Sequence, residues 1–229
     1  MNTRLAVFDC DGTLVDGQAD VCWAMERAFT RAGLPAPDST IVRRIVGLSL
    51  PVAVRQLAPA LTEDQVAAVT EFYRSSYRAR REEGLLDEPL YDGIAELLAA
   101  LHKDGWSLAV ATGKSDRGLA ACLATHGIAD LFVSLQTADR HPSKPHPAML
   151  EAALFEAGAQ PDQAVMIGDT SFDMLMARSA GVRAVGVAWG YHAPHELLAS
   201  GAASVADSVA ALGAALDGAL DGTLDGTLA

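Results

Sequence analysis

Residues 5–16 read Leu-Ala-Val-Phe-Asp-Cys-Asp-Gly-Thr-Leu-Val-Asp, an apolar run that ends in two aspartates one residue apart and then a glycine. The run from Leu5 to Phe8 is apolar on both faces, which is typical of a strand buried in a parallel sheet. Asp9 and Asp11 therefore follow the carboxyl end of a strand, where open α/β sheets bind their ligands. Two carboxylates this close repel each other unless a cation or a shared proton holds them, so the segment indicates a site for a divalent metal.

The composition limits the kinds of protein that this chain can be. Its 229 residues can bury a complete core and suit one large domain, or a core domain with a smaller insertion. The formal net charge of -12 opposes general binding to nucleic acid, which needs a basic surface. No apolar run approaches the ~20 residues that cross a bilayer, and the first residues are unlike a signal peptide. With three scattered cysteines and no C-x-x-C motif, these features predict a cytoplasmic protein without a membrane or nucleic-acid partner.

Residues 16–86 have a helical pattern and no convincing strand. Apolar side chains recur at helical spacing from Val21 to Ala32 and again from Glu63 to Arg80, where Thr62 is a candidate N-cap. This segment holds nine acidic and nine basic side chains, so the whole excess of acid lies outside it. We expect it to be an all-helical cap inserted after the first strand.

From residue 87 onward, predicted strands and helices alternate. The strands are expected at Trp106 to Ala111, Leu131 to Ser134, Ala164 to Ile167 and Ala184 to Ala188. The helices are expected at Asp92 to Lys103, Ser115 to His126, Pro147 to Ala157, Phe172 to Ser179 and after Ala193. Repeated strand–helix units predict a parallel sheet with right-handed crossovers and helices on both faces. The expected fold is therefore α/β, a doubly wound core of residues 1–15 and 87–216 with a helical cap of residues 16–86 and a low-complexity tail, 217–229.

The strand ends of this core carry polar groups that suit phosphoryl transfer. In chain order these groups are Asp9 and Asp11, then Thr112 and Gly113, then Lys144, and last Asp169 and Asp173. Acid pairs, a hydroxyl beside a free backbone amide and a lysine are the parts that a metal-assisted phosphoryl-transfer site needs. Magnesium suits such a set because it prefers hard oxygen ligands and keeps several waters.

These motifs, in this order, resemble those of the haloacid dehalogenase superfamily on its phosphatase side. They are Phe-Asp-Cys-Asp-Gly-Thr at 8–13, Ala-Thr-Gly-Lys at 111–114, Lys-Pro at 144–145 and Gly-Asp-Thr-Ser-Phe-Asp at 168–173. The resemblance implies a Rossmann-like core and magnesium-dependent hydrolysis of a phosphomonoester through an aspartyl-phosphate. A helical cap after the first strand is similar to that of the phosphoglycolate phosphatase-like subgroup, whose members act on small phosphorylated metabolites.

The resemblance also implies a role for each motif residue. Asp9 would be the nucleophile, and Asp11 would be the general acid that later activates water. The groups that bind the phosphoryl oxygens would be Gly12, Thr112, Gly113 and Lys144. The metal would be held by acidic residues, namely Asp9, Asp11 through its backbone carbonyl, Asp169 and, directly or through water, Asp173.

Within such a subgroup the cap is expected to set substrate specificity. Arg43 and Arg44 lie in Val-Arg-Arg-Ile-Val-Gly-Leu, where similar phosphatases place a substrate-facing segment. Either arginine could bind a substrate carboxylate, although a solvated helix face explains both equally well. Lys114 is interpreted as a salt-bridge partner that could also reach the substrate. The cap is expected to move at residues 15–17 and 84–89.

Other activities stay open at this stage. A sugar-phosphate mutase or a pyrophosphatase of the same superfamily is an alternative, and so is a non-enzymatic phospho-acceptor or ligand-binding protein. A true dehalogenase is disfavoured because Asp11 is present, and phosphonoacetaldehyde hydrolase is disfavoured because the cap contains no lysine. We expect a small-metabolite phosphatase, with phosphoglycolate as the first substrate to test, and either a monomer or a dimer.

Overall fold

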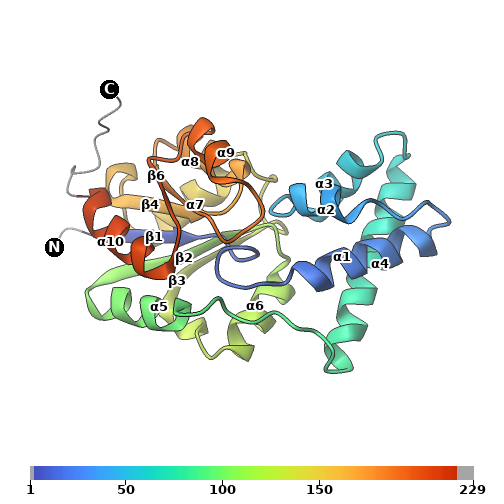
Figure 1. Ribbon diagram of the computed structural model, residues 1–229, viewed down its shortest axis with the longest axis horizontal. Helices are drawn as coiled ribbons and strands as arrows, with labels where there is room; N and C mark the ends of the chain where they lie inside the picture. The colour runs from blue at the N-terminus through green and yellow to red at the C-terminus, as the bar shows by residue number, and fades with distance from the viewer. Residues whose placement is uncertain (1–2, 221–229) are drawn as a thin grey trace.

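The computed structural model describes residues 3–220, which form a sheet covered by helices and a second, all-helical group beside it (Figure 1). The sheet has the order β3-β2-β1-β4-β5-β6, and its neighbouring strands pair in parallel. The strands are β1 Arg4–Phe8, β2 Trp106–Thr112, β3 Phe132–Thr137, β4 Ala164–Gly168, β5 Arg183–Val187 and β6 Ser204–Ala206. The order reverses direction at β1, so β1 borders the switch point at which such sheets bind ligands.

Helices cover both faces of the sheet, which confirms the predicted doubly wound α/β fold. They are α5 Ile94–Lys103, α6 Asp116–Thr125, α7 Ala148–Ala157, α8 Ser171–Ser179, α9 Pro194–Ala199 and α10 Val209–Leu220, with short 3-10 turns at η1 Ala129–Leu131 and η2 Pro161–Gln163. Side chains of α5, α6 and α10 pack in one apolar cluster, and those of α7, α8 and α9 pack in another on the opposite face.

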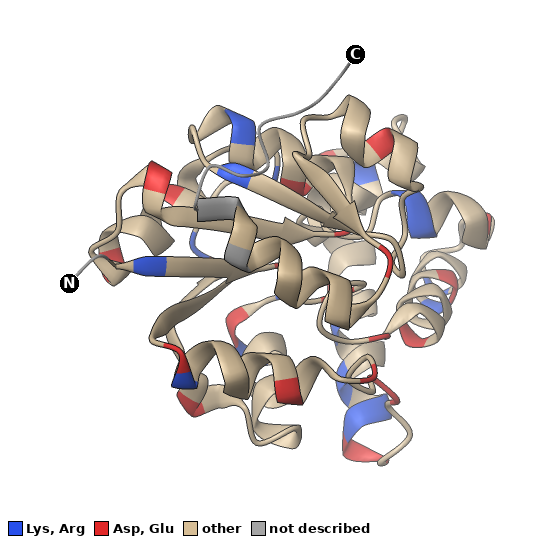
Figure 2. Ribbon diagram, turned by 60° about the vertical axis from the view of Figure 1, so that its left-hand side comes forward, with Lys and Arg blue, Asp and Glu red and all other residues tan. Residues whose placement is uncertain are grey.

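The burial of β1 explains its apolar sequence. Ala6 and Phe8 point into one of the two apolar clusters, Leu5 and Val7 point into the other, and all four are fully buried. Charged residues lie mainly on the helices and loops around the sheet (Figure 2). Each large apolar side chain buried in this way contributes about 1.5–3 kcal/mol to folding. The strand is thus held rigidly, and the residue that follows it emerges at a defined position.

The helical group follows β1 and consists of α1 Gln18–Arg31, α2 Ser39–Arg44, α3 Leu50–Leu57 and α4 Glu63–Glu82. It packs around its own apolar cluster, which includes Met25, Phe29 and Val69. Thr62 caps α4 as predicted, since its hydroxyl accepts from the Gln65 amide. The bounds of the two short helices α2 and α3 were not predicted, because these helices span too few turns to show a periodic pattern.

The carboxyl-terminal part of the chain differs from the prediction. β6 and α10 were not predicted, because β6 has three residues and α10 is rich in alanine and glycine. Leu212 and Leu216 of α10 are nevertheless fully buried against the sheet. The helix continues through Leu220, so residues 217–220, expected to be tail, are helical, and the rest of the expected tail, 221–229, lies outside the described residues. Among helices of residues 3–220, none combines the length and the hydropathy needed to cross a membrane.

Candidate active site

Three buried carboxylates meet where β1 and β4 end. Asp9 follows β1, Asp169 follows β4, and Asp173 lies in the first turn of α8. One oxygen of each lies within 4.8 Å of an oxygen of the other two, and all three residues are fully buried. The sheet topology therefore brings together three of the acidic residues for which the sequence predicted metal binding.

The hydrogen bonds of these carboxylates leave one oxygen unpaired. Asp169 accepts from the Thr13 hydroxyl and from the Tyr191 amide, each at 2.9 Å. Asp9 Oδ1 accepts from the Cys10 amide at 2.6 Å. Asp9 Oδ2 is buried and has no hydrogen-bond partner among the described residues. An unpaired buried carboxylate oxygen is costly, so it indicates a position where something else binds or reacts.

Lys144, from the loop after β3, neutralises part of this charge. Its Nζ lies 2.9 Å from Asp9 Oδ1 and 2.6 Å from Asp173 Oδ1, and its side chain is fully buried. Asp173 Oδ2 accepts from the Thr170 amide at 3.1 Å and from its hydroxyl at 2.7 Å. One ammonium group therefore bridges two of the three carboxylates.

A single lysine does not balance three carboxylates. Burial raises the pKa of Asp9 to about 7, with Lys144 opposing the rise and Asp173 adding to it. Burial and then the charges of Asp9 and Asp173 hold the pKa of Asp169 well above its usual value. Like charges this close cannot all ionise without further compensation. The oxygen donors and the spare negative charge of this buried cluster together fit a divalent cation.

Asp11 belongs to a second charged network that extends toward the cap helix α4. Lys114 Nζ lies 2.9 Å from Asp11 Oδ1, without hydrogen-bond alignment, and donates to Glu88 Oε1 at 2.6 Å. Tyr77 and Arg81 of α4 donate to the same Glu88 carboxylate at 2.8 and 3.3 Å. Lys114 thus forms the ion pairs expected of it. Glu88 was missed, because a lone glutamate in a linker belongs to no motif.

These neighbours set the protonation of the two acids in opposite directions. Burial raises the pKa of Asp11, and Lys114 only partly offsets the rise. For Glu88, burial also raises the pKa, but Lys114, Tyr77 and Arg81 outweigh it, and the pKa lies below its usual value. Relative to the free side chains, the surroundings thus favour the protonated form of Asp11 and the ionised form of Glu88.

Two glycines allow the backbone to approach the carboxylates. A Cβ on Gly12, whose φ is +83°, would lie 2.2 Å from Asp169 Oδ2. A Cβ on Gly113, next to Thr112 at the end of β2, would lie 2.6 Å from the carbonyl oxygen of Leu48 and 2.7 Å from that of Gly47. The loop between α2 and α3 therefore lies directly against the end of β2, and a side chain at either glycine would collide.

The prediction that Arg43 or Arg44 faces the substrate is not supported by their positions. Neither residue lines the cavity between cap and core, which has a volume of about 470 Å³. In α2 it is Val42 that turns into the cap core, which leaves Arg43 exposed. Arg44 reaches the core surface instead and forms two hydrogen bonds with Glu196, at 2.6 and 2.7 Å.

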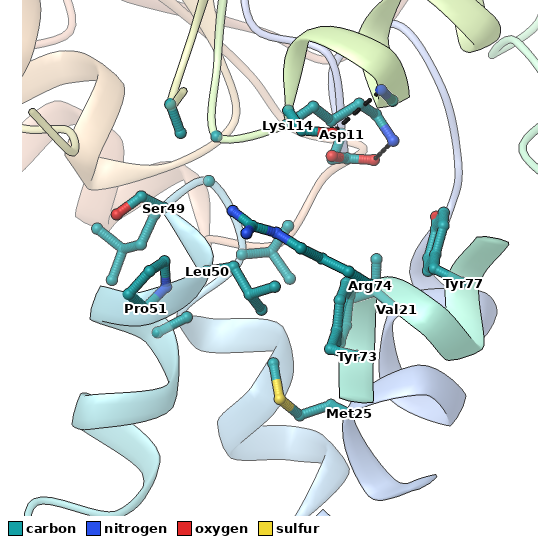
Figure 3. A pocket seen from close by; sticks show the side chains of 18 of the residues that line it. Asp11, Val21, Met25, Ser49, Leu50, Pro51, Tyr73, Arg74, Tyr77 and Lys114 are labelled. Atoms are coloured by element: carbon teal, nitrogen blue, oxygen red, sulfur yellow. Dashed lines mark hydrogen bonds and ion pairs between the residues drawn. The ribbon is translucent and has the colours of Figure 1, made fainter. Parts of the chain in front are cut away.

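Arginines other than Arg43 and Arg44 line the cavity. The cavity is lined by arginines of α4 and α6, namely Arg74, Arg78, Arg81 and Arg117. Figure 3 labels Arg74 among them. The spacing of the first three along α4 places them on one side of that helix. This i, i+4, i+7 pattern was the signal in the sequence that could have identified them.

His192, in the loop between β5 and α9, contacts protein groups through both of its ring nitrogens. Its Nδ1 accepts from the Ser171 amide at 3.0 Å, and its Nε2 lies 3.0 Å from the backbone oxygen of Arg44. Both nitrogens are therefore occupied by protein groups, and the imidazole connects the core to the cap.

The comparisons with known proteins agree with this fold. Residues 6–187 match the family described as haloacid dehalogenase-like hydrolase. A "Probable phosphatase IndB" of Dickeya dadantii is 37% identical over 201 residues, which cover 86% of each chain. A phosphoglycolate phosphatase of Vibrio vulnificus is 32% identical over 205 residues, which cover 86% of this chain and 89% of the relative. The chain therefore belongs to the haloacid dehalogenase-like hydrolases.

Solved structures support the same assignment. A "predicted phosphoglycolate phosphatase" from Haemophilus somnus superposes with a TM-score of 0.80 at 27% identity, over 93% of this chain and 97% of the other. A hydrolase from Pseudomonas syringae gives a TM-score of 0.83 at 26% identity, over 94% and 98% of the two chains. The likeness thus extends over the sheet and the helical group together.

Proposed function

We propose that this protein is a magnesium-dependent phosphatase that hydrolyses a small phosphorylated metabolite through an aspartyl-phosphate on Asp9. The observation that carries the proposal is the buried, unpaired Oδ2 of Asp9 at the end of β1, beside the ammonium group of Lys144. An oxygen held in this way, desolvated but free to form a bond, suits a nucleophile. The phosphatase names of relatives at 32–37% identity support the reaction class.

Asp9, Asp169, Asp173 and the backbone carbonyl of Asp11 are the groups that we propose hold Mg²⁺. The fit is chemical, because all of these groups are oxygen donors and the three side chains share one buried site. When bound, the ion would supply positive charge that offsets the carboxylates and the phosphoryl group.

In the proposed mechanism the residues of this chain act in two steps. Asp9 Oδ2 attacks phosphorus, the bond to the leaving oxygen breaks, and Asp11 gives its proton to that oxygen. Asp11, now ionised, then takes a proton from water, which attacks the same phosphorus and releases phosphate from Asp9. The raised pKa of Asp11 suits the first of these roles. Throughout, the Thr112 hydroxyl, the Gly113 amide and Lys144 would hold the phosphoryl oxygens.

We further propose that residues 16–86 act as a cap that excludes water, with residues 15–17 and 84–89 as its hinges. Support comes from the separate apolar cluster of α1–α4 and from the loop that packs over Gly113. The role of such a cap would be to protect the aspartyl-phosphate while the leaving group departs.

The test is release of inorganic phosphate from p-nitrophenyl phosphate and from phosphoglycolate, with Mg²⁺ and after chelation. We expect Mg²⁺-dependent turnover that the Asp9→Asn variant lowers by a factor on the order of 10³ or more. The matched control is Asp162→Asn, which changes an exposed aspartate in η2 and should keep full activity. Activity that survives in Asp9→Asn would rule out the nucleophile.

Two alternatives give different products in the same assay. A mutase would transfer the phosphoryl group to a second hydroxyl of an added sugar phosphate, which ³¹P NMR detects. A phospho-acceptor would accumulate phosphate on Asp9 without releasing it, which intact-protein mass spectrometry detects.

A further inference from the structure

The cavity beside the carboxylates is much larger than the phosphoryl site alone requires. It has a volume of about 470 Å³ and reaches from Asp11, Gly113 and Lys114 into the helical group. A two-carbon phosphoester occupies roughly the space of five water molecules at about 30 Å³ each. Such a substrate would leave most of the cavity filled with solvent, whereas pockets of this size commonly enclose ligands with a ring or several rings.

One wall of the cavity is apolar. It is formed by side chains of α1, α3 and α4, among them Val21, Met25, Leu50, Pro51 and Tyr73 (Figure 3). Val21, Met25, Leu50 and Tyr73 belong to or border the apolar core of the helical group. Such a wall favours binding of a ligand that has an apolar surface to bury against it.

The other chemical feature of the cavity is positive charge. The cationic residues in its lining are Arg74, Arg78, Arg81, Lys114 and Arg117, and the acidic ones are Asp11, Glu71 and Asp139. This excess of cations stands against a formal net charge of -12 for the whole chain. Lys114 and Arg81 are already paired with Glu88, so the arginines farther from the hinge are the ones available for a ligand.

Arg74 is the best placed of these arginines. In Figure 3 its side chain extends from α4 into the space between Leu50 and Asp11. Its ion pair is with Asp139, whose carboxylate oxygen lies 3.7 Å away, and both side chains are partly exposed. That contact is too long for a good hydrogen bond, so a ligand carboxylate could replace it with two charge-assisted ones.

We propose that the cavity is a leaving-group site for an organic group of ring size that carries a carboxylate. The apolar wall packs against the ring, and Arg74 binds the carboxylate. This inference rests on the proposed phosphatase function and narrows it: the preferred substrate is an aryl or similarly ring-sized phosphomonoester acid rather than a two-carbon one.

The experiment compares kcat/KM for phenyl phosphate, 4-carboxyphenyl phosphate and phosphoglycolate in wild type and in Arg74→Gln. Wild type should favour the carboxylated aryl ester over phosphoglycolate by at least tenfold. Arg74→Gln should lower kcat/KM about tenfold or more for 4-carboxyphenyl phosphate and leave phenyl phosphate unchanged. The intrinsic reactivity of each ester is the same for both enzymes. A change in the ratio of kcat/KM between 4-carboxyphenyl phosphate and phenyl phosphate therefore reports the contact between Arg74 and the carboxylate.

Two further variants distinguish the loss of the contact between Arg74 and the ligand carboxylate from a general loss of structure. Leu50→Ser should lower kcat/KM for both aryl esters about equally, by up to about tenfold, without affecting phosphoglycolate. Arg27→Gln changes an arginine of α1 outside the cavity lining and should change none of the three values. Circular dichroism and thermal unfolding check that each variant is folded.

The outcomes distinguish this inference from the function on which it rests. The inference is overturned if Arg74→Gln leaves the ratio of the two aryl esters unchanged, or if wild type prefers phosphoglycolate. If wild type hydrolyses no ester, the proposed function fails. In that case calorimetric binding of 4-hydroxybenzoate, compared between wild type and Arg74→Gln, still tests the site: Arg74-dependent binding supports it, and binding that is absent or independent of Arg74 overturns it.

Discussion

At the scale of single residues, Lys144 stabilises the site because its ammonium group neutralises part of the charge of the buried carboxylates. Burial lowers the pKa of this lysine, but Asp173 and Asp9 outweigh the effect and hold the pKa above its usual value. The ammonium group is therefore charged at neutral pH. Its two partners are equally buried, so each depends on it for compensation.

Replacing Lys144 with methionine should destabilise the metal-free protein by about 3–5 kcal/mol, because it leaves buried carboxylates without their partner. Urea unfolding with chelator present measures this loss. Added Mg²⁺ should recover part of the stability if the carboxylates hold the ion, whereas Lys103→Met, at an exposed position of α5, should stay within about 0.5 kcal/mol of wild type. Equal stability of the two variants would contradict this account of the site.

At the scale of elements, the contact between β2 and the cap loop decides how closely the cap approaches. Gly113 has no Cβ, and the carbonyl oxygens of Gly47 and Leu48 occupy the space that one would fill. The same loop is attached to the core by Ser143, whose hydroxyl accepts from the Ser49 amide at 2.8 Å. The position of the loop thus depends on the absence of a side chain at Gly113 and on the hydrogen bond between Ser49 and Ser143.

We therefore expect Gly113→Ala to displace the cap loop while the core stays folded. Phosphatase activity should fall by one to two orders of magnitude, on the scale expected for misplacement by about 1 Å, with only a small change in thermal stability. Gly213→Ala is the matched control, because its Cβ would meet only Leu97 Cδ1 at 3.4 Å. Full activity in Gly113→Ala would show that the loop can move to make room for a Cβ without any effect on activity, which would contradict the prediction.

At the scale of the whole molecule, polar contacts join the helical group to the core at positions far apart in the chain. Arg44 of the cap pairs with Glu196 of the core, and its backbone oxygen faces His192 Nε2. The neutral imidazole satisfies both neighbours, accepting at Nδ1 from Ser171 and donating at Nε2 to Arg44. Burial lowers the pKa of His192, although the hydrogen bond to Arg44 opposes this and Glu196 and Asp173 also raise it.

This lowered pKa predicts a loss of stability in mild acid. The unfolded chain takes up a proton near pH 6.5 and the folded chain only at lower pH, so the contribution of His192 is complete above that value and is lost as the pH falls through the folded pKa. Between pH 7.5 and 5.5, wild type should lose more unfolding free energy than His192→Asn. Asp9, whose raised pKa acts in the opposite direction, is common to both proteins. Equal slopes with pH would contradict the prediction.

The predictable part of the site is the part that follows strands. Asp9, Thr112 and Asp169 come directly after runs that are apolar on both faces, and parallel strands deliver such residues to one edge. The motifs were recognisable for the same reason, since each combines a strand end with its polar residue. Glu88 was not predictable, because its partners Tyr77, Arg81 and Lys114 meet only when the linker, the cap helix and the core are folded together.

The sequence by itself determined the α/β class, the helical insertion after the first strand and the residues at the strand ends. It could do so because strand burial and helical periodicity are local patterns. Only the tertiary structure decided which arginines face the cavity, since periodicity shows that residues share a side of a helix but not what that side packs against. Arg44 pairs with Glu196, 152 residues away, while Arg74 reaches the cavity, and that choice depends on how the cap sits on the core.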